Sequence, residues 1–412
     1  MTVLFSRALR VWRRSVVGSG LPGLVDRTLV RRSFRARTRT PRATLIVSAP
    51  GNGNIGDQAL LEALIENIGG PVTVIVPDAA EPEMSDDCRR RVSVCRLPGL
   101  LYGNGAEHRA AVAGFGEALA DAAHLCIVGA DVMDGRYSLP ASVRRSTLAT
   151  AAARAGVDTR VIGFSWSDRP RSAARRSLAA AGRSGVRLLL RDPVSAARAR
   201  RDGIVGVREA ADVVFAARSV ERSAAADVLE GVDRPVALVN VSGLLAERLD
   251  QTDDYVAVVD GLRSRGLHVV LLPHVARERA GDLAACAAVA ERAGPTDVTH
   301  VRRLLTPAQV RGLAERSTIT VTGRMHLAVM SLLQGVPAVT LATQGKVEGL
   351  MQLFGVPGLC VSPEHGFSAD VMDAVEGVLD EASSARRAIR TALPRVVELA
   401  LRNVEGLPVS VR

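Results

Sequence analysis

The sequence predicts an α/β protein with two Rossmann-like domains whose parallel sheets face a central cleft. Its 412 residues exceed what one hydrophobic core usually organises, and 47% of them are hydrophobic, as in a globular protein. From Thr44 onward, short apolar runs alternate with helical segments. This alternation stops at a polar, alanine-rich stretch after Phe215 and then begins again, which indicates two similar halves.

The first half contains five candidate strands separated by segments with apolar residues at i, i+3 and i+4. The strands are predicted at 44–49, 72–76, 124–129, 160–164 and 186–190. The clearest helices between them are 57–68 and 145–156. Strands joined through helices are typical of a parallel sheet covered by helices on both faces.

The second half repeats this pattern. Its strands are predicted at 236–241, 268–272, 318–322 and 338–342, and its helices include 254–266 and 324–335. We therefore expect an N-terminal domain over 43–218, a linker over 219–234, a C-terminal domain over 235–380 and C-terminal helices over 381–412. The carboxyl ends of both sheets would line the cleft, where open α/β sheets bind ligands.

A basic N-terminal arm, residues 1–42, accounts for the charge of the chain. It holds eleven arginines and one acid, Asp26, so it carries the whole net charge of +10 and leaves an electrically balanced body. A neutral body argues against nucleic acid as the partner. We expect a flexible arm that folding does not require, with peripheral contact to an anionic membrane as the sharper alternative.

The sequence also limits the compartment and the metal chemistry. No stretch reaches the 18 apolar residues of a membrane-spanning helix, and no signal peptide precedes the body, so we expect a cytoplasmic protein. The five cysteines are scattered and form no C-x-x-C pair. Reduced thiols are expected, with no disulfide framework and no metal site.

A glycine-rich turn follows the first strand. Gly51, Gly53 and Gly56 form G-x-G-x-x-G, the spacing of a dinucleotide-binding loop, so an NAD-dependent oxidoreductase has to be considered. Asp57 comes directly after the third glycine. A carboxylate there would compete with the pyrophosphate for the helix N-terminus, and it would also serve as an N-cap.

A second motif follows the strand at 318–322. Arg324 and His326 stand in the first turn of a predicted helix at a sheet's carboxyl edge. Arginine offers a forked donor for a carboxylate or phosphate, and histidine can transfer a proton near neutral pH. Lys346 is the single lysine of the chain and follows the next strand, where a compact charge suits a phosphate.

Taken in order, these motifs resemble the polysaccharide pyruvyl transferase family. The matching residues are Asn54, Gly56 and Asp57 (N-x-G-D), Arg191, Asp192 and Ser195 (R-[DE]-x-x-S), Asp212 and Phe215 in the strand expected next, Pro273 and His274 (P-H), Arg324 and His326 (R-x-H), and Lys346 and Gly349 (K-x-x-G). Two segments depart from the pattern. Ala130 and Asp131 replace glycines in GADVMD, and Asp168 replaces a proline in GFSWSD.

The resemblance implies a GT-B-like fold and transfer of the pyruvyl group of phosphoenolpyruvate to a sugar, forming a ketal. The sugar would belong to a cell-surface glycan or its lipid-linked precursor, and no cofactor would be needed, since phosphoenolpyruvate is the donor substrate. The implied donor-binding residues are Arg324, Arg191 and Lys346, with Asn54 and His274 as further substrate contacts. His326 would be the general acid, and Asp57 would orient or deprotonate the acceptor hydroxyl.

Other functions stay open on the sequence alone. A GT-B glycosyltransferase would bind a nucleotide sugar in the C-terminal half, and an NAD-dependent oxidoreductase would use the glycine turn at 51–56. A non-catalytic member of the family is a further alternative, because of the departures at 129–134.

Overall fold

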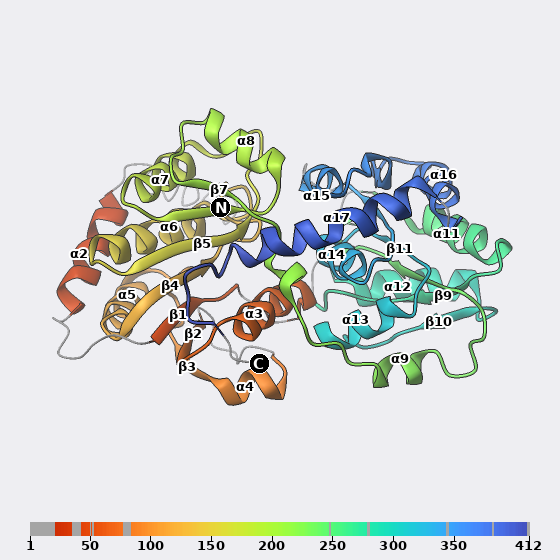
Figure 1. The fold of residues 1–412 in the computed structure, drawn as a ribbon, viewed down its shortest axis with the longest axis horizontal. Helices are drawn as coiled ribbons and strands as arrows, with labels where there is room; N and C mark the ends of the chain where they lie inside the picture. Colours follow the sequence, from red (N-terminus) through yellow and green to blue (C-terminus); the bar gives the residue numbers. More distant parts are fainter. Residues whose placement is uncertain are drawn as a thin grey trace, which may run out of the picture.

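The computed structural model describes residues 21–34, 43–49, 51, 53–76, 84–246, 249–277, 281–342, 346–380 and 383–409. Within them, two parallel sheets form two domains that lie side by side (Figure 1). The central strands are buried on both faces, because helices cover each sheet. The predicted α/β class with two Rossmann-like domains is confirmed.

The N-terminal sheet has seven strands in the order β3-β2-β1-β4-β5-β6-β7. The strands are β1 Ala43–Val47, β2 Val72–Val76, β3 Val92–Arg96, β4 Ala122–Val128, β5 Asp158–Phe164, β6 Arg187–Leu190 and β7 Val207–Glu209. The helices of this domain are α2 Leu21–Ser33, α3 Ile55–Asn67, α4 Asp86–Arg91, α5 Gly105–Leu119, α6 Leu139–Arg154, α7 Ser172–Arg183 and α8 Pro193–Arg201.

The C-terminal sheet has six strands in the order β10-β9-β8-β11-β12-β13. The strands are β8 Val236–Asn240, β9 His268–Leu271, β10 Val298–His300, β11 Ile319–Thr322, β12 Ala338–Leu341 and β13 Cys360–Val361. The helices after β7 are η1 Val213–Ala216, α9 Ser223–Val228, α10 Gly243–Ala246, α11 Thr252–Ser264, α12 Asp282–Ala293, α13 Pro307–Glu315, α14 Met325–Leu333, α15 Lys346–Phe354, η2 Pro357–Leu359, α16 Phe367–Leu379 and α17 Ser384–Leu401.

Part of the basic arm is folded, contrary to our expectation of a flexible extension. Residues 21–33 form α2, which packs against α5 and α6 at the outer side of the N-terminal domain (Figure 1). Val30 is buried there, and Asp26 lies 3.2 Å from His108 Nε2. Removing residues 1–42 would therefore expose the faces of α5 and α6. Residues 1–20 and 35–42 of the arm lie outside the described residues.

The C-terminal end of the chain joins the two domains. The C-terminal helices expected over 381–412 are one helix in the described part, α17, which runs from the C-terminal domain back toward the N-terminal one (Figure 1). Asn403 follows it, donating to Ala211 O and accepting from Gly163 N. Val409 pairs with Ile68 beyond it. Of the helices that the structure describes, none has the length and apolar character needed to cross a membrane.

Candidate active site

A cavity of about 380 Å³ lies between the domains, at the carboxyl ends of β1 and β4 on one side and of β9 and β11 on the other. Six of the seven predicted site residues line it. They are Asn54, Asp57, His274, Arg324, His326 and Lys346. A larger groove, of about 760 Å³, lies along α12 and β10 and contains none of them. The motifs therefore converge on the interdomain cavity, as open α/β sheets would place them.

The glycine turn serves contact between the domains. Asn54 is the N-cap of α3, accepting at Oδ1 from Gly56 N at 3.0 Å, so the cap is not Asp57 as expected. Asn54 also forms a backbone bridge with Val275. A Cβ on Gly53, whose φ is +66°, would lie 2.3 Å from Ala276 O. The C-terminal domain thus covers the helix end on which a dinucleotide pyrophosphate would sit.

Asp57 stands in the first turn of α3, close to His326. A Cβ on Gly56 would lie 2.3 Å from His326 Nδ1, so only glycine at this position leaves room for the imidazole beside α3. Asp57 Oδ2 lies 3.4 Å from Arg277 Nη2. Burial raises the pKa of Asp57, although the charges of His326 and Arg277 act in the opposite direction. A carboxylate with a raised pKa is suited to accept a proton.

We expect Asp57→Asn to make the protein more stable at neutral pH while lowering turnover. A carboxyl group whose pKa is higher in the folded than in the unfolded state destabilises the fold once it ionises. The wild type should therefore lose stability as pH rises above about 4, the ordinary pKa of aspartate, through the folded value. Urea unfolding of both proteins between pH 4 and 8 gives the difference. Parallel curves would contradict the prediction.

His326 lies against a buried carboxylate. Its Nε2 is 3.4 Å from Asp212 Oδ2, which is long for a hydrogen bond and short for a charge pair. Burial would raise the pKa of Asp212, but His326 and Arg191 outweigh it and lower that pKa, so Asp212 stays ionised. A buried carboxylate beside an imidazole fixes the orientation of the ring. The sequence placed Asp212 in a strand; it caps η1, accepting from Val214 N.

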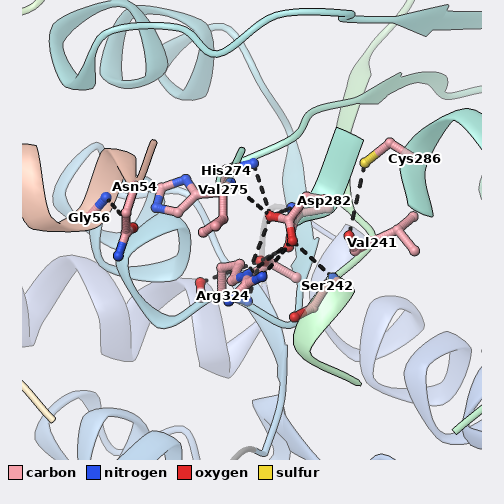
Figure 2. A network of polar contacts seen from close by, with 12 residues as sticks. Asn54, Gly56, Val241, Ser242, His274, Val275, Asp282, Cys286 and Arg324 are labelled. Atoms are coloured by element: carbon pink, nitrogen blue, oxygen red, sulfur yellow. Dashed lines mark hydrogen bonds and ion pairs between the residues drawn. The ribbon is translucent and has the colours of Figure 1, made fainter. Parts of the chain in front are cut away.

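Arg324 is held by Asp282, at the centre of a polar network (Figure 2). Its Nη2 and Nε donate to Asp282 Oδ1 at 2.6 and 3.1 Å. The same carboxylate accepts from the backbone N–H groups of Gly243, His274 and Val275. This bidentate pair fixes the plane of the Arg324 guanidinium at the cavity wall. Asp282 opens α12, and no motif in the sequence pointed to it.

His274 turns a neutral imidazole toward the site. The ring is buried, and neither nitrogen has a hydrogen-bond partner in the part of the chain that the structure describes. Burial, together with the charges of His326 and Arg324, lowers the pKa of His274 well below its ordinary value. A neutral ring with one donor and one acceptor nitrogen can hydrogen-bond to a hydroxyl group of a ligand.

Arg191, the seventh predicted site residue, lies behind the cavity wall and not in it. Its side chain is fully buried, and its three nitrogens donate to Ser165 Oγ, Asp212 Oδ2 and Asp131 Oδ1. Asp131 separates it from the cavity and also pairs with Lys346 Nζ. In this arrangement Arg191 does not reach the cavity itself, because its nitrogens donate to protein oxygens, Asp131 among them.

Arg145 is a cavity residue that sequence reasoning missed. It stands on α6, buried, with Nε donating to Val128 O at 3.2 Å and its guanidinium 5.9 Å from the ring centroid of Tyr102. Nη2 has no hydrogen-bond partner, and none of the described carboxylates pairs with this side chain. A buried cation without a counter-ion favours binding of an anion. The arginine-rich composition gave no signal for it.

The cavity holds no recognisable metal centre among the residues described: three or more His, Cys, Asp or Glu side chains nowhere gather in a way that could hold an ion. Two half-exposed aromatic side chains, Tyr102 and Tyr137, line its outer part on the N-terminal domain. Aromatic faces suit the apolar faces of sugars, while Arg324, Lys346 and Arg145 supply positive charge.

Comparison with known proteins identifies the family. The model of the polysaccharide pyruvyl transferases matches residues 54–345, from the cap of α3 to just before Lys346. The chain belongs to the polysaccharide pyruvyl transferase family. The resemblance seen in the motifs is thereby confirmed, and none of the curated proteins matches the chain.

Solved structures similar to this family member share its fold. A putative UDP-N-acetylglucosamine 2-epimerase from Listeria monocytogenes has a TM-score of 0.59 at 11% identity, covering 88% of this chain and 95% of its own. Sucrose-phosphate synthase from Thermosynechococcus elongatus has a TM-score of 0.54 at 12% identity, covering 88% and 97%. UDP-GlcNAc 2-epimerase from Methanocaldococcus jannaschii has 0.53 at 11%, covering 86% and 99%. The GT-B-like architecture is confirmed.

Proposed function

We propose that the protein transfers the pyruvyl group of phosphoenolpyruvate to a sugar of a cell-surface glycan or its lipid-linked precursor, forming a pyruvate ketal. The observation that carries the proposal is the pair of His326 and the buried carboxylate of Asp212, facing a cavity that also holds the Arg324 guanidinium. A proton donor beside a fixed anion-binding fork is what an enol phosphate requires. Family membership supports the same chemistry.

The reaction needs protons at defined atoms. One acceptor hydroxyl adds to C2 of phosphoenolpyruvate while C3 takes up a proton and becomes a methyl group. A second hydroxyl then replaces the phosphate at C2, and its proton leaves with the phosphate. His326 is the proposed general acid for C3 or for the leaving phosphate, and Asp57, with its raised pKa, is the proposed base for the hydroxyl.

Binding groups divide between the two domains. Arg324, oriented by Asp282 at the cavity wall, is the proposed partner of the donor carboxylate, since a guanidinium attracts a carboxylate by its charge. His274, Asn54 and Lys346 are further proposed substrate contacts at the same cavity. Such positioning, together with charge stabilisation, supplies the part of the rate that one general acid does not.

The basic arm suits an acceptor that is anchored in a membrane. On α2, Leu24 and Val25 are half-exposed, and Arg31 and Arg32 occupy the last turn. Apolar and basic side chains on one exposed helix favour peripheral binding to anionic lipids. We therefore propose that the enzyme works in the cytoplasm, at the membrane face that presents the lipid-linked sugar.

Phosphoenolpyruvate should stabilise the protein against heat, and NAD should not. At 100 times its dissociation constant a ligand adds about 2.7 kcal/mol to the free energy of unfolding, which moves the melting temperature by several degrees. The covered N-terminus of α3 is the reason to expect no effect of NAD. Melting temperatures measured with phosphoenolpyruvate, NAD or a nucleotide sugar, each added separately, check this prediction.

The same experiment separates the alternatives. A shift with the nucleotide sugar alone would favour a GT-B glycosyltransferase, to which the fold is equally suited. A shift with NAD alone would overturn the proposal, and transfer of pyruvate to a sugar, detected as phosphate release, would support it directly.

A further inference from the structure

Asp131 occupies an unusual position between the two domains. It follows β4 in the N-terminal domain, and its two carboxylate oxygens are divided between two cations. Oδ1 accepts from Arg191 Nη2, and Oδ2 accepts from Lys346 Nζ of the C-terminal domain. Its side chain is about one-quarter exposed and lines the cavity, so solvent and ligands can reach it.

The Asp131 side chain is ionised. Burial would raise the pKa of Asp131, but Lys346 and Arg191 outweigh it and hold that pKa well below the ordinary range. The carboxylate is therefore an anion throughout the physiological range. The backbone beside it is unfavourable, since Ala130 has a φ of +45°, a region that residues other than glycine rarely adopt.

Arg191 and Lys346, the two cations that Asp131 contacts, could equally bind two oxygens of a phosphate group. An ammonium and a guanidinium that converge on two oxygens of one anion form a typical seat for a phosphate or carboxylate. Arg191 is fully buried and Lys346 nearly so, which strengthens their attraction for any anion placed between them. In this structure, that anion is Asp131.

We propose that Asp131 is a built-in competitor of the donor: its carboxylate fills a seat for an anionic group, formed by Arg191 and Lys346, from which a donor phosphate must displace it. The assignment rests on the proposed function only for the identity of the donor. The seat itself takes phosphate as a chemical class. Displacement of Asp131 also breaks its ion pair across the cleft, so donor binding is coupled to the contact between the domains.

The test measures binding of inorganic phosphate and of phosphoenolpyruvate by titration calorimetry at low ionic strength. Asp131→Asn and Asp131→Gly both remove the competing charge, and the asparagine keeps the size of the side chain. We expect the dissociation constant for phosphate to fall at least tenfold in both, about 1.4 kcal/mol. The matched control is Asp168→Asn, an exposed carboxylate of the same domain, which should change it by less than twofold.

A double variant locates the gain. Lys346→Met added to Asp131→Asn should abolish the tighter binding, because the seat then lacks its cation from the C-terminal domain. Unchanged or weaker phosphate binding in a folded Asp131→Asn protein would overturn the proposal. Tighter phosphate binding that persists without Lys346 would also overturn the proposal, since the anion would then bind elsewhere. Melting temperatures establish that each variant is folded.

The outcome is independent of the proposed reaction. Tighter phosphate binding without pyruvyl transfer by any variant would support the competitor role of Asp131 and refute the pyruvyl transferase activity. Pyruvyl transfer by the wild type, with phosphate affinity unaffected by Asp131→Asn, would support the activity and refute the competitor role.

Discussion

His326→Gln should lower turnover by about two to four decades, the contribution of a positioned general acid, and should leave the fold intact. Glutamine cannot give up a proton, yet its amide can reach toward Asp212 as the imidazole does. Donor affinity should persist, because Arg324 stays fixed by Asp282. Phosphate release under saturating substrates measures turnover, and calorimetry and melting temperature measure binding and stability on the same protein.

Arg324→Lys is the control for this experiment, because it should affect binding and not proton transfer. Lysine keeps the positive charge but cannot make the planar pair that Arg324 Nε and Nη2 form with Asp282. Its donor affinity should weaken, with a smaller change in turnover. Wild-type turnover in His326→Gln would remove His326 from the mechanism. A fall in stability with unaltered turnover per folded molecule would make His326 a structural residue.

The sequence predicted the interior of the fold better than its borders. The structure contains all nine predicted strands, each within two residues of its expected ends. The four strands that were missed, β3, β7, β10 and β13, are the four edges of the two sheets. Edge strands are short and half-exposed, and β3 and β7 carry arginine or glutamate, so their hydrophobic pattern is weak.

The site shows a similar division. Motif spacing placed Asn54, Asp57 and His326 at sheet edges, and the two domains bring them together. It could not show which carboxylates neutralise the arginines, because these partners come from distant segments. Asp282 precedes Arg324 by 42 residues, and Asp131 precedes Arg191 by 60. The motif therefore predicts a direct donor contact for Arg191, whereas the structure uses its hydrogen bonds within the protein.

Asp212 belongs both to the buried ion pairs of Arg191 and to the surroundings of the proposed general acid, His326. It is fully buried, with Oδ2 accepting from Arg191 Nη1 at 3.1 Å and lying 3.4 Å from His326 Nε2. A carboxylate in this position pairs with Arg191 and orients the ring of His326. Asparagine in its place would present a neutral oxygen or a donor N–H₂ group to Arg191 and His326. Arg191 would then keep Asp131 as its remaining carboxylate partner.

Asp212→Asn should therefore lower both stability and turnover. Breaking a buried ion pair costs about 3–5 kcal/mol, and we expect the lower end because Asp131 still pairs with Arg191. Turnover should fall by up to about four decades, the full contribution of the acid that Asp212 positions. The loss of turnover should exceed what the loss of folded protein explains, because the carboxylate that orients His326 is gone. Urea unfolding and phosphate release between pH 5 and 9 measure these changes.

The matched control is Asp158→Asn. Asp158 likewise pairs with two arginines, Arg160 and Arg187, and with a histidine, since its Oδ2 lies 3.0 Å from His124 Nδ1, but none of these lines the cavity. Its loss should lower stability without altering turnover per folded molecule. If Asp212→Asn behaved in the same way, with stability lost and turnover per folded molecule unchanged, Asp212 would be a structural counter-ion of Arg191 and not a positioning residue of the site.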